Sequence, residues 1–332
     1  MPLVFLEMIE RFKEKKILVL GDLMVDHYIF GEATRISPEA PVPVVEVLSQ
    51  DFRLGGAANV VNCIIDMGAE SIPVGVVGDD DYGRWIVSEL KRRGINEACL
   101  LISRDKPTTR KIRVVVRGQQ LVRVDNEKRE DISPELEQKI MRFVEREIGR
   151  VDGVIISDYE KGMVTVKLLE KLIALARKNN KCIVTDARAK NLLHYSDVTV
   201  LRTNIPYSSA VTGITPINET SLRNIGLKLL TQLTCEAVVI TQGKDGMLIF
   251  EKNGGFTRIP ATSEIARDIT GAGDVVTSTL TLALVSGASK VDAARLANYA
   301  AGIKVGKLGT ATVTIEEFKA WLKGNEGRSV SY

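Results

Sequence analysis

The chain has 332 residues, of which 45% are hydrophobic and 26% are charged, and its formal net charge is +3. This length is sufficient for one large α/β domain or two ordinary ones. A nucleic-acid surface needs a concentrated basic stripe, which this small and interspersed charge does not indicate. The first 16 residues are charged too often for a signal peptide, and no run approaches the ~20 apolar residues of a membrane span. We therefore expect a cytoplasmic protein that binds neither nucleic acid nor membranes.

Short apolar runs alternate with amphipathic stretches along the whole chain. Strands are predicted, in chain order, at residues 16–20, 72–77, 154–156, 182–185, 198–201 and 237–240. Helices are predicted between them, at residues 57–67, 82–93, 134–148, 166–178 and 221–233. Apolar strands that alternate with crossover helices are typical of a mostly parallel sheet with helices on both faces. In such α/β folds, ligands bind outside the carboxyl ends of the strands.

Two segments break this alternation. Residues 27–48 contain three prolines and have no helical period, and residues 108–125 are typical of a β-hairpin that turns near Gly118. We expect these segments to form a small β-sheet that serves as a lid on a single domain of residues 1–324. The polar residues 325–332 are predicted to be a flexible tail.

The four cysteines are widely spaced, at Cys63, Cys99, Cys182 and Cys235. They form no CxxC pair, which argues against a zinc site or a redox dithiol. We expect them to be reduced residues of the core.

The sequence DITGAGD at residues 268–274 precedes an apolar helix predicted at residues 275–285. The backbone N–H groups of Gly271, Ala272 and Gly273 would converge at the start of this helix and form an anion site for a transferring phosphoryl group. Asp274 would repel an anion there, so its presence predicts a general base that takes a proton from an attacking hydroxyl. The alternative is a glycine-rich turn in which Asp274 only interacts favourably with the helix dipole.

Two earlier motifs carry candidate sugar-binding residues. Gly55 and Gly56 permit close backbone approach, and Asn59 in the following helix offers a donor and an acceptor to a polyhydroxy ligand, or else caps the helix. Asp22 and Asp26 follow the first predicted strand in the sequence GDLMVD. They could accept hydrogen bonds from sugar hydroxyls, although a solvated loop aspartate is an equally good interpretation of Asp22 alone.

The order of GDLMVD, GGAAN and DITGAGD is similar to that of the ribokinase-type (PfkB) carbohydrate kinases, over nearly the whole chain. In that family the first two motifs hold the sugar, and the third supplies the anion hole and the base. The resemblance implies a ribokinase-like fold, ATP as phosphoryl donor and Mg²⁺ as cofactor. It implies nucleotide contacts from Asn204, Thr241, Gly243, Gly246, Asn298, Gly271 and Gly273.

Four further stretches resemble one subfamily, the D-glycero-β-D-manno-heptose-7-phosphate kinases. They are RISPEAPVPVV at 35–45, KIRVVVRGQQLVRVD at 111–125, SDYEKG at 157–162 and ANYAAGIKVGKLGTATV at 297–313. The resemblance implies phosphorylation of the anomeric hydroxyl in ADP-heptose synthesis, and a homodimer formed through the lid. Many relatives are fused to a nucleotidyltransferase with an HxGH motif. Because the only histidines are His27 and His194, the chain looks like the kinase alone.

A phosphorylated sugar needs cations at its far end. The period of a strand predicts that Lys111, Arg113 and Arg117 share one face. We expect Lys111, Arg113 and, elsewhere on the lid, Arg35 to bind the sugar phosphate, since arginine can bind phosphate through two N–H groups. The alternative is a solvated face whose charge protects a sheet edge.

The chain departs from the family pattern at two places. Many relatives carry NxxE, whose glutamate helps to organise Mg²⁺ through water, but here Asn204 is followed by Ile205, Pro206 and Tyr207. Because Mg²⁺ keeps several waters and relies largely on the nucleotide phosphates, this loss should weaken metal handling without preventing transfer. DARAKN at 186–191 also differs from the more usual DPK-type sequence. Two other functions therefore stay open: a kinase for another sugar, sugar phosphate or nucleoside, and a non-catalytic sugar- or nucleotide-binding module.

Overall fold

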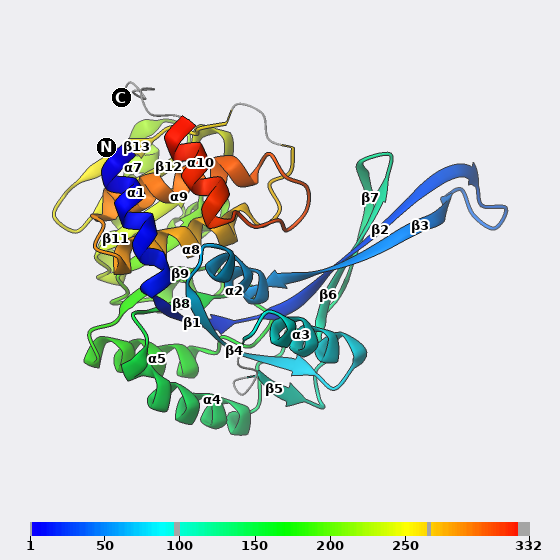
Figure 1. Ribbon diagram of the computed structural model, residues 1–332, viewed down its shortest axis with the longest axis horizontal. Coiled ribbons are helices and arrows are strands. Elements are labelled where there is room, and N and C mark those ends of the chain that lie inside the picture. The colour runs from blue at the N-terminus through cyan, green and yellow to red at the C-terminus, as the bar shows by residue number, and fades with distance from the viewer. Residues whose placement is uncertain (1, 96–99, 264–266, 325–332) are drawn as a thin grey trace.

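The computed structural model describes residues 2–95, 100–263 and 267–324 (Figure 1). Its main sheet has nine strands in the order β13-β12-β11-β10-β9-β8-β1-β4-β5. The strands from β11 to β5 are parallel, and β12 and β13 are antiparallel. The strands are β1 (Lys16–Gly21), β4 (Glu70–Gly78), β5 (Leu100–Ser103), β8 (Gly153–Ser157), β9 (Cys182–Asp186), β10 (Val200–Asn204), β11 (Ala237–Thr241), β12 (Met247–Glu251) and β13 (Phe256–Ile259).

Helices cover both faces of this sheet because its central strands are apolar on both sides. In β1, Ile17 and Val19 pack into the core on one face, and Leu18 and Leu20 pack into the core on the other. The first face is covered by α1 (Pro2–Glu10), α2 (Ala57–Asp66), α3 (Asp81–Arg92), α8 (Ala272–Val285), α9 (Lys290–Lys304) and α10 (Ile315–Gly324). The second is covered by α4 (Pro134–Glu147), α5 (Val166–Lys178) and α7 (Glu219–Leu233). The predicted α/β class, with helices on both faces of a mostly parallel sheet, is confirmed.

The predicted strands are all present, although β10 begins at Val200, two residues later than expected. Five of the six predicted helices begin and end within two residues of their expected bounds, and the sixth, α8, begins three residues earlier than expected. The helices α1, α6 (Ile205–Thr212), α9 and α10 were not predicted. In α9 the buried residues include the polar Asn298 and Lys304, which weakens the apolar period of this helix in the sequence.

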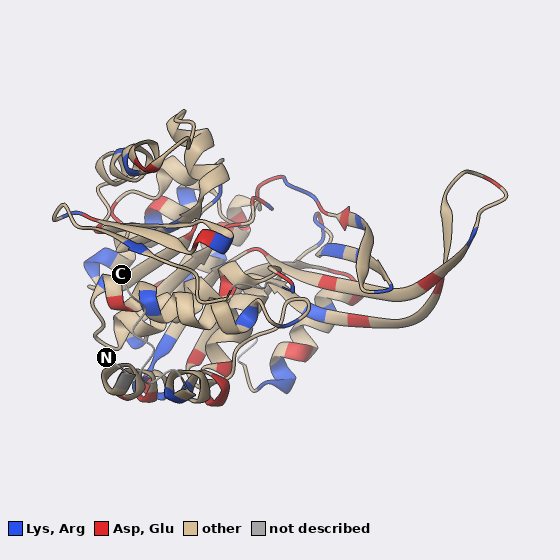
Figure 2. Ribbon diagram, turned by 90° about the horizontal axis from the view of Figure 1, so that it is seen from above, with Lys and Arg blue, Asp and Glu red and all other residues tan. Residues whose placement is uncertain are grey.

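A second, smaller sheet projects from the body and has the strand order β3-β2-β6-β7 (Figures 1 and 2). Its strands are β2 (Leu23–Ile36), β3 (Pro43–Gly56), β6 (Thr109–Val116) and β7 (Gln119–Asn126). The strands β2 and β3 are antiparallel, β2 and β6 are parallel, and β6 and β7 form the predicted hairpin. Its turn is made by Arg117 and Gly118, with φ of +50° and +79°. The expectation that Arg117 shares a strand face with Lys111 and Arg113 is therefore wrong, because β6 ends before it.

Cys63, Cys182 and Cys235 are free thiols, of which Cys63 and Cys235 are buried. Cys99 and the predicted tail, residues 325–332, lie outside the described residues. In the described part of the chain, no helix has both the length and the apolar character needed to cross a membrane.

Candidate active site

A cavity of about 290 Å³ lies where the small sheet meets the carboxyl ends of the central strands. Those strand ends are in register, since Ser157 of β8 pairs with Gly21 of β1 and with Asp186 of β9. The cavity is lined by Met24, Asp26, Gly56, Lys111, Arg113, Arg123, Tyr159, Asp186, Arg188, Arg202, Asn204, Tyr207, Thr270, Gly271, Gly273, Asp274 and Thr310. It therefore joins the predicted base, the predicted anion site and the cations of the small sheet in one space.

Asp274 lies in the first turn of α8 and is only 2% exposed. Its Oδ2 accepts a hydrogen bond of 2.6 Å from Asn59 Nδ2, and its Oδ1 accepts one from the Tyr159 hydroxyl. Burial raises the pKa of Asp274 to about 7, although these two hydrogen bonds act in the opposite direction. A carboxyl group with this pKa is suited to act as a general base near neutral pH.

The start of α8 leaves backbone donors for an anion. The N–H of Ala272 donates to the Ile269 carbonyl at 3.1 Å, so it is engaged locally. The N–H groups of Gly273 and Asp274 belong to the first turn, where a helix has no internal acceptor for them. Gly271, with φ of +80°, turns the chain into the helix.

Close packing explains why glycine is needed twice in this motif. A Cβ on Gly271 would lie 3.0 Å from Asn59 Nδ2. A Cβ on Gly273 would lie 2.9 Å from both Nη atoms of Arg202. Arg202 is itself held by Asp186 Oδ1 at 2.5 Å and by Thr241 Oγ1 at 3.2 Å. The two glycines therefore let the anion site sit directly against Asn59 and Arg202.

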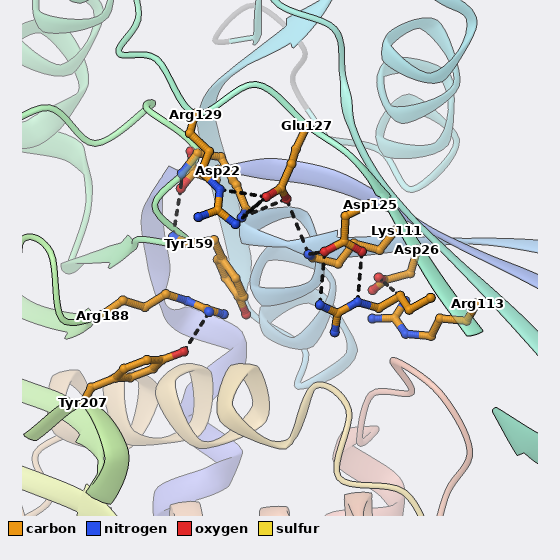
Figure 3. A network of polar contacts seen from close by, with 12 residues as sticks. Asp22, Asp26, Lys111, Arg113, Asp125, Glu127, Arg129, Tyr159, Arg188 and Tyr207 are labelled. Carbon is orange, nitrogen blue, oxygen red and sulfur yellow. Dashed lines mark hydrogen bonds and ion pairs between the residues drawn. The ribbon is translucent and has the colours of Figure 1, made fainter. Parts of the chain in front are cut away.

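Ion pairs fill the small-sheet side of the cavity (Figure 3). Arg113 Nη1 lies 2.5 Å from Asp26 Oδ1, and both residues are buried. Lys111 Nζ lies 3.0 Å from Asp125 Oδ2 and 3.7 Å from Glu127 Oε2. The two predicted phosphate-binding cations thus line the cavity, but each already has a carboxylate partner.

Asp22 lies outside the cavity wall. Its buried carboxylate accepts hydrogen bonds from the backbone N–H groups of Tyr159 (2.8 Å), Lys161 (3.2 Å) and Met163 (3.1 Å). Burial, together with nearby Asp158, raises the pKa of Asp22 to about 6. Asp22 therefore holds the loop after β8, which carries Tyr159 into the cavity.

The other predicted sugar-binding residues are placed differently. Asn59 does not line the cavity, because it points to Asp274. Gly56 lines it with φ of +56°, and a Cβ on Gly55 would lie 2.6 Å from Asp26 Oδ2. Arg35 is exposed far along the small sheet, 3.7 Å from Glu46.

Of the predicted nucleotide-binding residues, Asn204 lines the cavity and caps α6 by accepting a bond of 3.0 Å from the Tyr207 N–H. Thr241 ends the neighbouring strand and pairs with Asn204. Gly243 and Gly246 flank the turn between β11 and β12, and Asn298 donates to the Pro260 carbonyl at 2.8 Å. Thr241, Gly243, Gly246 and Asn298 do not line the cavity, and their roles stay predictions.

Sequence reasoning missed Tyr159, Arg188 and Arg202. All three lie on or just after a central strand, so their positions at the carboxyl edge were a usable signal. Arg188 Nη1 donates to Tyr207 Oη at 2.9 Å, and its guanidinium lies 4.4 Å from the centre of the Tyr159 ring (Figure 3). Among the described residues, no group of three His, Cys, Asp or Glu side chains could hold a metal ion.

Residues 14–317 match the pfkB family carbohydrate kinases. The chain belongs to this family. It is therefore a carbohydrate kinase, an enzyme that transfers a phosphoryl group to an alcohol. It is 41% identical over 312 residues to the bifunctional protein HldE of Desulfatibacillum aliphaticivorans, which covers 94% of this chain and 64% of that protein. It is 40% identical over 300 residues to HldE of Geobacter sulfurreducens, covering 90% of the kinase and 61% of HldE. The kinase thus spans less than two thirds of the length of these relatives.

Two solved structures share the fold of this kinase. One is Arabidopsis thaliana ribokinase complexed with ribose and ATP, with a TM-score of 0.75 and 17% identity, covering 93% of this chain and 99% of that one. The other is phosphofructokinase-2 from Escherichia coli in complex with substrates and products, with a TM-score of 0.77, 17% identity and the same coverage. At this identity they establish the ribokinase-like fold alone.

Proposed function

We propose that this kinase transfers the γ-phosphoryl group of ATP to the anomeric hydroxyl of D-glycero-β-D-manno-heptose 7-phosphate. The product is the 1,7-bisphosphate, a precursor for ADP-heptose and hence for lipopolysaccharide core. The observation that carries the proposal is the shared cavity, in which Asp274, the start of α8 and the small-sheet cations face one space. The four stretches that resemble heptose-7-phosphate kinases, and the similarity to HldE proteins, support the choice of sugar.

In this mechanism Asp274 takes the proton of the anomeric hydroxyl, whose oxygen forms a bond to the γ-phosphorus. The bond from that phosphorus to the bridging oxygen of ADP breaks, and ADP leaves with the bonding electrons. The N–H groups of Gly273 and Asp274 stabilise charge on the transferring group. Neutral donors from Asn59 and Tyr159 each hold one oxygen of the Asp274 carboxylate, so the carboxylate meets the hydroxyl in a fixed orientation.

The 7-phosphate is expected at the opposite end, among Lys111, Arg113 and Arg123. Because Asp26 and Asp125 already bind these cations, the phosphate must share them with the carboxylates. Such a site selects a dianionic group over a neutral hydroxyl, since only the former competes for the N–H donors.

ATP is expected to lie along the carboxyl edge from the start of α8 towards Asn204, Thr241, Gly243, Gly246 and Asn298. Of the acidic residues in this part of the cavity wall, Asp186 is bound to Arg202 and Asp274 is the proposed base. Mg²⁺ therefore fits this site as an ion held mainly by the nucleotide phosphates and water, and it would neutralise phosphate charge there.

The small sheet is expected to close over the sugar and to pair with a second copy. Its strand β7 is a sheet edge that is exposed along its length, with Leu121, Val122 and Val124 in contact with solvent. An exposed apolar edge is a template for pairing with another strand. Sedimentation equilibrium tests this: a dimer that dissociates in Val122→Lys supports it, and a wild-type monomer contradicts it. We place the kinase in the cytoplasm, where ATP is available.

A coupled assay of ADP formation with Mg²⁺ tests the function, offering heptose 7-phosphate, ribose, fructose 6-phosphate and adenosine in parallel. Turnover confined to the heptose phosphate is expected. Turnover on another substrate would be consistent with the proposed mechanism but would show that the proposed sugar is wrong. Nucleotide binding without turnover on any substrate would favour the non-catalytic module, for which Tyr207 in place of a glutamate is the specific observation.

A further inference from the structure

One cation of the active-site cavity differs from the rest. Among the residues that the structure describes, five cationic side chains line this space, and four of them are paired with carboxylates: Lys111 and Arg123 with Asp125, Arg113 with Asp26, and Arg202 with Asp186. Arg188 is the fifth, and within residues 2–95, 100–263 and 267–324 it forms no ion pair. Two carboxylates that act on Arg188 electrostatically, those of Asp186 and Glu160, are engaged elsewhere. Asp186 accepts from Arg202, and Glu160 accepts from the backbone N–H of Lys190.

Two tyrosines hold Arg188 in place. Its Nη1 donates to Tyr207 Oη at 2.9 Å, and its guanidinium lies over the Tyr159 ring at 4.4 Å and near the Tyr207 ring at 5.6 Å. Figure 3 shows the side chain extending between these rings. Aromatic faces attract and orient a guanidinium without neutralising it. Arg188 is therefore positioned, charged and left with N–H donors for another acceptor.

The position of Arg188 indicates which acceptor that is. Tyr159, over which it stacks, donates to Asp274, so Arg188 lies close to the reacting end of the cavity. Tyr207 belongs to α6, whose first turn contains no acidic residue and whose cap is the predicted nucleotide contact Asn204. Arg188 is thus on the nucleotide side of the base, whereas the cations for the sugar phosphate come from the small sheet.

We propose that Arg188 binds the β- and γ-phosphate oxygens of the nucleotide and stabilises the charge of the transferring phosphoryl group. A planar guanidinium matches the oxygens of two adjacent phosphates, and charge-assisted hydrogen bonds of this kind are the strong ones. Arg188 thereby supplies fixed positive charge at a wall that offers Mg²⁺ no carboxylate from α6. This inference rests on the proposed kinase reaction but not on the identity of the sugar.

The test is the affinity of the protein for ATP, ADP and AMP, measured by calorimetry without sugar. Arg188→Met removes the charge and keeps an extended side chain against the tyrosine rings, and Arg188→Lys keeps the charge without the planar fork. Loss of a charge-assisted hydrogen bond predicts about 10- to 100-fold weaker binding of ATP and ADP to Arg188→Met, with AMP within about twofold of wild type. The affinity of Arg188→Lys for ATP and ADP should lie between those of wild type and Arg188→Met. The control is Lys190→Met, an exposed cation two positions away, which should bind all three nucleotides as wild type does.

A second readout separates phosphate binding from a structural role. Arg188→Ala should lose about 100-fold in kcat, and added guanidinium ion should restore part of it, since the ion can occupy the vacated place between the rings. The proposal would be overturned if Arg188→Met bound ATP and AMP equally more weakly than wild type. It would also be overturned if guanidinium failed to restore kcat in Arg188→Ala and the affinity for ATP were unchanged. A loss of affinity for the sugar phosphate alone would overturn it too. If wild type binds ATP far better than AMP and Arg188→Met loses that preference, Arg188 stands as a phosphate ligand even where heptose 7-phosphate proves not to be the substrate.

Discussion

Asp274 and Asp26 line the same cavity and are almost equally buried, at 2% and 3% exposure, yet they are held in opposite ways. Asp274 accepts hydrogen bonds from two neutral groups, whereas Asp26 is paired with the cation Arg113. Burial raises the pKa of both, and for Asp26 the positive charge of Arg113 opposes this rise. A carboxylate held by neutral donors can accept a proton near neutral pH, but an ion-paired one stabilises its partner. The neighbours, more than the burial, decide which aspartate can act as a base.

The largest effect should come from removing the base. In Asp274→Asn the side chain keeps its shape but cannot accept the proton, so kcat should fall about 1,000-fold or more. The affinities for ATP and for heptose 7-phosphate should stay within a few-fold of wild type. Steady-state kinetics and calorimetry measure these two quantities. A variant with more than a tenth of wild-type kcat would show that Asp274 is not the base.

The same substitution should stabilise the fold at neutral pH. Between the ordinary pKa of 3.8 and the folded value of about 7, the folded chain holds a proton on Asp274 that the unfolded chain has released. Stability from this group therefore falls as pH rises through that window, by up to ~4 kcal/mol. Asp274→Asn does not lose stability in this way. Asn59 Oδ1, which has no hydrogen-bond partner among the described residues, can accept from the new amide after Asn59 rotates. Urea unfolding should give equal stabilities near pH 4 and a more stable variant at pH 8. A difference that does not change with pH would contradict the assigned pKa.

Breaking the Asp26–Arg113 pair should destabilise the fold, in contrast to Asp274→Asn. Arg113→Met leaves Asp26 buried without its cation, so the free energy of unfolding should fall by about 3 kcal/mol at pH 7. The double variant Asp26→Asn, Arg113→Met should recover most of this loss, because no buried charge remains. Arg123→Met is the control: its side chain is half exposed, and loss of its pair with Asp125 should cost at most ~1 kcal/mol. Additive effects of the two single substitutions in urea unfolding would show that the pair is not coupled.

The fold and the base motif could be predicted because they depend on local patterns. Apolar runs such as that of β1 predict buried strands, and DITGAGD places its glycines and Asp274 at the start of a helix. The partners of Asp274 could not be predicted. Asn59 and Tyr159 are 215 and 115 residues away from it in sequence, and no period relates such positions. For the same reason the sequence predicts a sugar contact for Asp22, whereas its carboxylate accepts from the backbone of the loop after β8.

The smallest effect concerns how the neutral donors tune the base. Tyr159→Phe keeps the ring against which Arg188 stacks but removes the hydroxyl that donates to Asp274. Because that hydrogen bond lowers the pKa of Asp274, its loss should raise the pKa by about one unit. The acidic limb of kcat/KM against pH should move up by the same amount, so activity at pH 6 should fall about tenfold and the difference should shrink towards pH 9. Tyr195→Phe is the matched control, since Tyr195 donates to the buried Asp158 at 2.9 Å outside the cavity and should leave the limb in place. A Tyr159→Phe profile that is lower at every pH but not displaced would mean that Tyr159 only orients Asp274, and that burial alone sets the proton affinity of the base.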